Sequence, residues 1–321
     1  MRRNSKHRDL PPVGGAPGMD RSRRLISTLL NWYNSHGRDL PWRKTSNPYH
    51  ILVSEIMLQQ TQVTRVQEKY PPFLRRFPSL HSLARGPQRD VVVAWQGMGY
   101  NNRSVRLHRL AKEVVREHGG RLPLDFGALT RLPGVGPYTA NAILSFAFGQ
   151  QVPVVDVNVR RFLSRVLWPM TSTVALRKEK EIWVVARRLV PGGAASQWNQ
   201  ALMDIGATVC TSRQPSCRSC PVSHLCMSSA SMVALPARHL REEPSLHGVP
   251  NRIYRGRIIQ ELRRHNAGRK IRADRLGKRI HPCFTPKYER WLANLLTGLH
   301  RDGLIVLHGN GSLDTRYVAL A

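Results

Sequence analysis

Acidic side chains are scarce in this sequence. Its 321 residues contain 20 Asp and Glu against 50 Lys and Arg, which gives a formal net charge of +30 at neutral pH. The excess is spread along the chain, with seven basic and two acidic residues in 1–24 and seventeen and seven in 238–321. An excess of this size attracts phosphate backbones whatever their base sequence, which favours nucleic acid over an anionic membrane surface as the partner.

Long hydrophobic runs are also missing. No stretch approaches the roughly 18 consecutive apolar residues of a membrane-spanning helix. The basic start of the chain has no apolar segment typical of a signal peptide, so we expect a soluble protein of the cytoplasm, such as the bacterial cytoplasm or nucleoid, with no membrane partner. Pro11-Pro12 and Gly14-Gly15 predict that residues 1–24 form a disordered basic arm.

Cysteine is rare, and four of the five cysteines lie within seventeen residues. Such a group in a cytoplasmic chain argues against a disulfide framework and predicts a metal-binding loop over residues 210–226. The spacing allows either a tetrahedral zinc site or an iron–sulfur cluster. We expect Cys283, which lies far from the group, to be a buried core thiol. The four grouped cysteines are Cys210, Cys217, Cys220 and Cys226.

Two arginines, Arg213 and Arg218, lie inside the cysteine loop. If a bound metal holds the loop rigid, their side chains are placed to contact phosphates. They are equally well explained as ordinary exposed arginines.

Apolar residues recur at three- and four-residue spacing between Leu25 and Cys226, which predicts a mostly α-helical block. Its helices are expected at 24–33, 48–70, 103–118, 137–148, 159–167, 178–189 and 196–207. Ser, Ala, Pro and His then dominate residues 227–248, which predicts a linker. Residues 249–321 show three further helical patterns and two short strand-like runs around His308-Gly309-Asn310-Gly311. We interpret this last segment as a small winged-helix-like α+β module; an accessory helical tail is the alternative.

A glycine-rich turn stands between two of the expected helices, in the run from Leu132 to Ala140. Gly134 and Gly136 permit a tight turn around Val135, and Pro137 suits the first position of the following helix. Backbone N–H groups of such a turn can bind a DNA phosphate without any side chain. A plain connection between two helices explains the same residues.

Two carboxylates have unusual positions. Asp156 follows the apolar run from Val152 to Val155 and precedes a helix, which suits a helix N-cap. Glu55 lies on the apolar stripe of the helix that begins at Asn47-Pro48. Desolvation there favours the protonated form, which is the form of a general acid. A buried salt bridge to an arginine is the alternative for Glu55.

With these residues in view, the chain resembles the helix-hairpin-helix (HhH-GPD) DNA glycosylases that carry an iron–sulfur cluster, and most closely the MutY-type adenine DNA glycosylases. The matching segments extend from Trp32 to Cys226. They are Leu40-Pro41-Trp42, residues 54–63, Gly97-Met98-Gly99-Tyr100, residues 132–140, residues 155–159 and the four cysteines. The resemblance implies an all-α, two-lobed glycosylase domain over residues 25–209 with a cluster loop at 210–226.

The resemblance also implies roles for individual residues. Glu55 matches the general acid that protonates the purine, and Asp156 matches the carboxylate that stabilises the sugar cation. Asn158 and Tyr138 are expected in the same pocket. A further group is implied to contact DNA, with Gln59 and Tyr100 entering the duplex beside the flipped nucleotide. That group is Gln59, Gln60, Tyr100, Gly134, Val135, Gly136 and Arg213.

The cysteine spacing matches the family's ligands for one 4Fe-4S cluster per chain, with zinc as the alternative cofactor. Tyr138 occupies the position where bifunctional relatives carry a lysine that forms a Schiff base, so we expect a monofunctional enzyme.

Two features depart from the adenine glycosylase pattern. Asn101-Asn102 replaces the usual Tyr-Ala before Arg103, and residues 249–321 do not resemble the usual Nudix-like inspection domain. We therefore expect a monomeric base excision repair enzyme that removes adenine mispaired with 8-oxoguanine or guanine. Downstream enzymes that process its abasic product are expected as further partners. The alternatives are a thymine or uracil DNA glycosylase acting on T:G or U:G mismatches, and a non-catalytic DNA-binding protein.

Overall fold

The computed structural model describes residues 18–169, 177–229, 243–264, 269–309 and 311–321. The described chain is mostly helical, as expected, and it divides into two compact units. One unit contains the residues up to Asp39 and those from Asn141 to Arg238; the other contains Leu40–Ala140 and His239–Ala321. None of the described helices is both long and apolar enough to cross a lipid bilayer.

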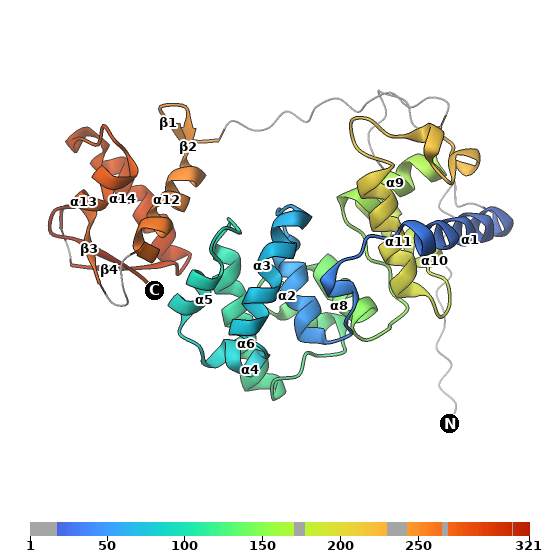
Figure 1. Ribbon diagram of the computed structural model, residues 1–321, viewed down its shortest axis with the longest axis horizontal. Coiled ribbons are helices and arrows are strands. Elements are labelled where there is room, and N and C mark those ends of the chain that lie inside the picture. The colour runs from blue at the N-terminus through green and yellow to red at the C-terminus, as the bar shows by residue number, and fades with distance from the viewer. Residues whose placement is uncertain (1–17, 170–176, 230–242, 265–268, 310) are drawn as a thin grey trace. The chain divides into compact units, whose positions relative to one another are not determined.

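The first unit is a helical bundle around an apolar core (Figure 1). The long helices α1 and α9 both pack against α11, and fully buried Trp198 and Phe162 fill the space between helices. Cys210, Cys220 and Cys226 pack at the edge of this core. Its helices are α1 (Met19–His36), α9 (Val157–Leu167), α10 (Glu179–Arg188), α11 (Ala195–Thr208) and the 3-10 turns η2 (Cys217–Ser219) and η3 (Ser223–Leu225).

The helices of residues 40–140 form the first part of the second unit. Helix α6 packs against α4 and α5, and α2 packs against α3. The helix α8 (Pro137–Phe146) crosses from this unit into the other. The remaining elements are η1 (Pro41–Arg43), α2 (Pro48–Leu58), α3 (Val63–Arg76), α4 (Leu80–Arg85), α5 (Gln88–Ala94), α6 (Asn102–His118) and α7 (Phe126–Arg131).

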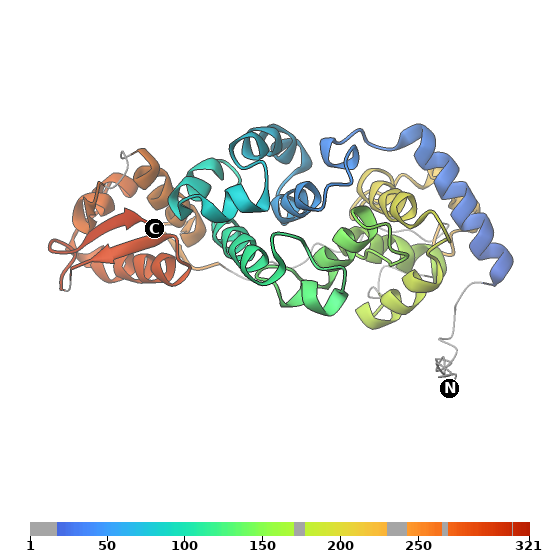
Figure 2. The ribbon, with the colours of Figure 1, turned by 90° about the horizontal axis from the view of Figure 1, so that it is seen from below.

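Residues 245–321, which we call the C-terminal module, combine helices with short strands (Figure 2). A three-stranded antiparallel sheet has the order β3-β5-β4, with Ile271 opposite Val318 and Ile305 opposite Leu320. Strands and helices alternate along the chain as in a winged helix, which confirms that interpretation. The elements are β1 (Ser245–Leu246), β2 (Val249–Pro250), α12 (Asn251–Arg264), β3 (Ile271–Arg272), α13 (Ala273–Ile280), η4 (Pro286–Tyr288), α14 (Glu289–Arg301), β4 (Ile305–His308) and β5 (Tyr317–Leu320).

Three expected boundaries differ in the structure. Helix α1 begins at Met19, so the predicted arm of residues 1–24 is too long. Arg21 anchors the added turn by donating to the Val166 and Leu225 carbonyls. Residues 1–17 lie outside the described part. The β1–β2 hairpin occupies the end of the predicted linker 227–248, of which 230–242 are not described.

The expected helix at 48–70 is two helices, α2 and α3. Between them Gln60 adopts a left-handed backbone with φ of 56°. Helix α2 already ends at Leu58, because Gln59 leaves the helical conformation with ψ of 110°. The left-handed backbone of Gln60 is uncommon for any residue with a side chain.

Candidate active site and cysteine pocket

Glu55 lies on the buried helix α2. The side chain of Asn47 accepts hydrogen bonds from the N–H groups of Tyr49 and His50, and Pro48 occupies the first turn, so the helix begins where the sequence predicts. Every residue of α2 from Ile51 to Met57 is buried, and Glu55 is 4% exposed. The fold therefore keeps this carboxyl group away from bulk water, as a general acid requires.

Asp156 is the N-cap of helix α9. Its Oδ1 accepts the Val159 N–H at 2.7 Å, and its Oδ2 accepts a hydrogen bond from Asn158 Nδ2 at 2.9 Å. Both donors stabilise a negative charge on Asp156, as does the N-terminus of the helix that it caps. The capping interpretation is thus correct, and it leaves the half-buried carboxylate suited to stabilising a cation.

The segment before Asp156 is held by Asn199 of α11, a residue that the sequence reasoning did not select. Its Oδ1 accepts the Val154 N–H at 3.0 Å, and its Nδ2 donates to Ser145 Oγ and to the Val152 carbonyl. Asn199 is fully buried. The amide thus bonds the backbone on both sides of Pro153, which fixes the segment that leads to Asp156.

Arg161 joins the Asp156 pair to the start of the cysteine loop. Its Nη2 donates to Asn158 Oδ1 at 3.0 Å and to the Gly206 carbonyl at 2.6 Å, and its Nε donates to the Cys210 carbonyl at 2.9 Å. Burial lowers the pKa of Arg161, while Cys210 and Asp156 favour its charged form. A continuous chain of hydrogen bonds therefore connects the Cys210 backbone to Asp156.

Gly206 makes that chain sterically possible. A Cβ atom at this position would lie 3.0 Å from Asn158 Cβ and 3.1 Å from the Asn158 backbone. Helices α9 and α11 can approach this closely only because residue 206 has no side chain.

The four predicted cysteine ligands line one pocket together with Phe162, Arg165 and Val209. All four are half-buried and none forms a disulfide in the described structure. Arg165 Nη1 donates to Cys210 Sγ at 3.4 Å, and Cys226 Sγ donates to the Arg165 carbonyl at 3.3 Å. Helix α9 thus helps to hold the four cysteines around one shared pocket.

The electrostatics of this pocket favour a bound cationic centre. Burial raises the pKa of Cys226, and it raises the pKa of Cys220 to about 11; in both cases the neighbouring thiols add to the effect. The thiolates that ligate metals would be stabilised by a positive charge in the pocket. Within the described residues, no three His, Cys, Asp or Glu side chains converge closely enough for a single ion.

Two loops of the second unit carry the residues predicted to enter DNA. The first, Gln59–Gln62, follows α2, and the second, Gly97–Asn101, precedes α6. Gln60 and Tyr100 both have positive φ angles, of 56° and 41°. Non-glycine residues in this conformation are uncommon and occur preferentially at functional sites. Tyr100 is 51% exposed.

Arg103 of α6 ties these two loops together. Its Nη1 donates to the carbonyls of Ile56, Met57 and Gln59, at the end of α2. Its Nη2 donates to Thr61 Oγ1 at 2.9 Å and to the Met98 and Gly99 carbonyls at 2.9 and 3.1 Å. The sequence shows Arg103 only as part of a motif, whereas the structure shows one buried guanidinium that fixes both loops.

Aromatic rings enclose the same guanidinium. Its carbon lies 5.4 Å from the centre of the Trp95 ring and 5.7 Å from that of Tyr100. Burial lowers the pKa of Arg103 to about 10, so the side chain is charged at neutral pH. The Tyr100 ring is therefore partly held by a cation–π contact even though half of it faces solvent.

The glycine-rich turn has the expected form. Gly134 has a φ of 83°, Gly136 is exposed, and α8 begins at Pro137. Val135 donates its N–H to the Leu132 carbonyl at 3.1 Å and its side chain is buried, so Val135 supports the turn from inside. Tyr138 is half-buried in the first turn of α8.

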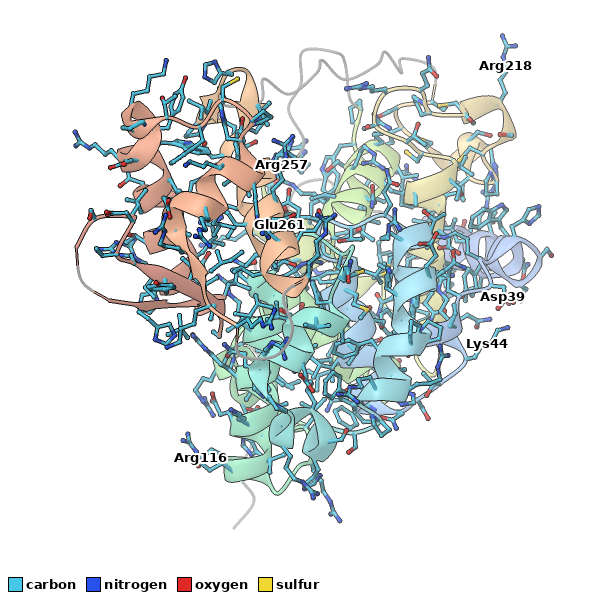
Figure 3. All side chains as sticks on the ribbon, turned by 60° about the vertical axis from the view of Figure 1, so that its left-hand side comes forward. Asp39, Lys44, Arg116, Arg218, Arg257 and Glu261 are labelled. Atoms are coloured by element: carbon cyan, nitrogen blue, oxygen red, sulfur yellow. The ribbon has the colours of Figure 1, made fainter. Side chains whose placement is uncertain are left out.

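Arg213 and Arg218 are exposed on the cysteine loop, and Figure 3 shows Arg218 extending outward from it. The prediction for Cys283 was wrong: this thiol is exposed, in the turn between α13 and η4. It lies in a turn that caps α13, whereas the apolar positions nearby are taken by Ile280 and Leu292.

Comparisons with known proteins agree with this architecture. Residues 53–188 match the HhH-GPD superfamily of base excision DNA repair proteins. The adenine DNA glycosylase of Mycolicibacterium smegmatis is 39% identical over 236 residues, which are 73% of this chain and 79% of that protein. The human adenine DNA glycosylase is 42% identical over 233 residues, which are 70% of this chain and 42% of the human protein.

A solved structure of a thermostable thymine-DNA glycosylase is also similar. It has a TM-score of 0.61 and 32% sequence identity, and the match covers 66% of this chain and 98% of that one.

Replacing Arg103 with Met tests how far the two loops depend on one side chain. We expect the free energy of unfolding to fall by about 3 kcal/mol, because buried carbonyl groups at both loops lose their donor. Arg116→Met on the same helix removes an exposed charge that projects outward in Figure 3, and it is expected to change the value by about 0.5 kcal/mol or less. Urea unfolding followed by circular dichroism measures both. Equal effects of the two substitutions would contradict the assigned role of Arg103.

Proposed function

Because this chain belongs to the adenine DNA glycosylases of the HhH-GPD superfamily, we propose that it removes adenine mispaired with 8-oxoguanine or guanine in duplex DNA. It is a base excision repair N-glycosylase. One observation carries this proposal. Helix α2 buries Glu55, Asp156 is the N-cap of α9, and each carboxyl group lies in a motif that matches the family.

Glu55 is proposed as the general acid. Its protonated carboxyl group donates a proton to the purine, so that the base leaves with the electron pair of the glycosidic bond. Burial in α2 supports this role, since a carboxyl group shielded from water retains its proton more readily.

Asp156 is proposed as the carboxylate that stabilises the positive charge on the sugar until water attacks C1′. The hydrogen bonds from Val159 and Asn158 hold this carboxylate in one orientation. Asn158 is in turn fixed by Arg161, so its proposed place in the pocket is to position Asp156.

Tyr138 supports a monofunctional reaction. A lysine at this position would allow covalent attack on the sugar by its amine, and a tyrosine hydroxyl cannot form a Schiff base. We propose that the product is an abasic site, left for other repair enzymes to process.

One 4Fe-4S cluster is proposed as the cofactor, held by Cys210, Cys217, Cys220 and Cys226. The shared pocket that the four thiols line supports this assignment, and the spacing of the cysteines matches that of the family's cluster ligands. When bound, the cluster would supply charge and rigidity to the loop that carries Arg213 and Arg218, and no catalytic step is assigned to it. Arg161 bonds the Cys210 carbonyl, so order in this loop supports the Asp156 network.

Duplex DNA is the proposed partner, bound by a monomer. Its proposed contacts are the exposed Gly136 turn and Arg213, together with the loops that carry Gln59, Gln60 and Tyr100. The basic excess of the chain supports sequence-independent contacts with phosphates.

Excision of mismatched thymine is a second candidate function. The 32% identity to a thymine-DNA glycosylase over nearly the whole of that protein favours it. The Asn101-Asn102 departure in the loop after Tyr100 also separates this chain from the usual adenine enzymes.

Single-turnover excision from four duplexes distinguishes these activities. The duplexes carry A opposite 8-oxoguanine, A opposite G, T opposite G and U opposite G. We expect adenine release from the first two, reduced about a hundredfold or more in Asp156→Asn, because the amide keeps the helix cap but loses the charge. Release of only T or U, or of no base, would reject the proposal.

A matched control for Asp156→Asn is Asp125→Asn. Asp125 caps α7 in the same way, with its side chain accepting the Ala128 N–H at 2.7 Å. Both variants should retain their helix caps, so a loss confined to Asp156→Asn isolates its catalytic charge.

Metal analysis tests the cofactor. Protein purified without oxygen is expected to contain about four iron and four sulfide per chain, and Cys220→Ser is expected to lose them. Cys283→Ser is the control, since its exposed thiol lies outside the pocket. Zinc without iron in the wild-type protein would overturn the assignment.

A further inference from the structure

The side chain of Asn101 does not form the hydrogen bond that is usual at its position in the fold. It stands at the N-cap of α6, where asparagine normally accepts a backbone N–H of its own helix. No such bond forms here, and the Ser104 N–H instead donates to the Asn101 carbonyl. The side-chain oxygen is engaged by a residue 162 positions later in the sequence.

That residue is Arg263, at the end of α12 in the C-terminal module. Its Nη2 donates to Asn101 Oδ1 at 3.0 Å and to the Val92 carbonyl at 2.7 Å, and its Nε also approaches the Val92 carbonyl at 3.2 Å. Burial lowers the pKa of Arg263 to about 10, so it is a charged donor at neutral pH. The guanidinium thus bridges the end of α5 and the start of α6.

Apolar contacts show that the C-terminal module is packed onto these helices. Val92 of α5 and Val105 of α6 belong to the same hydrophobic cluster as Ile258, Ile259 and Leu262 of α12. Away from this cluster, Gln88 Nε2 donates to the Gly303 carbonyl at 2.7 Å. Arg263 therefore acts at the polar edge of a formed interface within the second unit.

The contact at Asn101 adjoins the most exposed residue of the loop. Tyr100 precedes Asn101, has a left-handed backbone, and accepts the Arg103 N–H with its carbonyl at 3.0 Å. Arg103 fixes this loop from within, and Arg263 fixes its last residue from the C-terminal module.

We propose that Arg263 is a positioning residue for Tyr100, and that the C-terminal module takes part in extruding the target nucleotide through the Arg263–Asn101 contact. This inference rests on the proposed entry of Tyr100 into the duplex. It gives a physical role to Asn101, which departs from the family pattern. It also assigns the C-terminal module a function beyond general attraction to phosphates.

The test compares Arg263→Gln with Arg264→Gln. Both remove one positive charge from the last turn of α12, but Arg264 is exposed and its guanidinium pairs with Glu261 of the same helix. Deleting the whole C-terminal module is unsuitable, because it would uncover Val92 and Val105. Extrusion is measured as the fluorescence rise of 2-aminopurine placed at the target position, which requires no bond cleavage.

Arg263→Gln is expected to lower the fluorescence change and to slow single-turnover excision about tenfold, because a small misplacement of Tyr100 is costly. The Kd for undamaged duplex should match that of Arg264→Gln. Excision is compared per folded active site, because losing the bonds to the Val92 carbonyl also lowers stability. Asn101→Ala should reproduce the effect, and adding it to Arg263→Gln should cause little further loss, since both remove the same contact.

If Arg263→Gln extrudes and excises the target base as well as Arg264→Gln does, the inference is overturned. A loss explained entirely by a smaller fraction of folded enzyme, measured by active-site titration, would also overturn it. Excision is followed on whichever mismatch the wild-type protein processes fastest. A preference for thymine would therefore reject the proposed base specificity while leaving this comparison valid.

Discussion

The hydrogen bonds of the Arg103 guanidinium are the interaction on which the loops of Gln60 and Tyr100 depend. Its Nη1 donates hydrogen bonds to the carbonyl groups that lack helical partners where α2 ends. Its Nη2 donates to carbonyl groups of the loop before α6. Both loops contain a residue with an unfavourable positive φ, Gln60 or Tyr100. A planar fork with five donors can satisfy so many acceptors at once, which a lysine ammonium cannot do.

The first unit solves a comparable problem with Arg161. Asp156 must keep a negative charge and a fixed orientation, and a helix N-cap provides both. Asn158, Arg161 and the Cys210 carbonyl extend this arrangement to the cysteine loop, across an approach that Gly206 makes possible. In both units, therefore, a buried arginine bonds to backbone carbonyl groups and thereby helps to fix the position of a side chain with a proposed function.

The sequence predicts the features whose causes are local. Asn47-Pro48, the Asp156 cap, the grouped cysteines and the hairpin of β4 and β5 each depend on residues close together in the chain. The arginines that organise the site depend on partners about 45 residues away, and nothing local distinguishes Arg103 or Arg161 among 50 basic residues. The break after α2 was missed for the same reason, since Arg103 stabilises it from another helix.

A structure of the full chain bound to duplex DNA tests this account most directly. The duplex should carry a non-cleavable 2′-fluoro analogue of adenosine opposite 8-oxoguanine, so that the extruded nucleotide remains intact. The account predicts that Tyr100 and a glutamine of the Gln59–Gln62 loop lie within the base stack, with Arg103 still bonded to both loops. A complex in which Tyr100 lies away from the DNA, or in which Arg103 releases either loop, would contradict it.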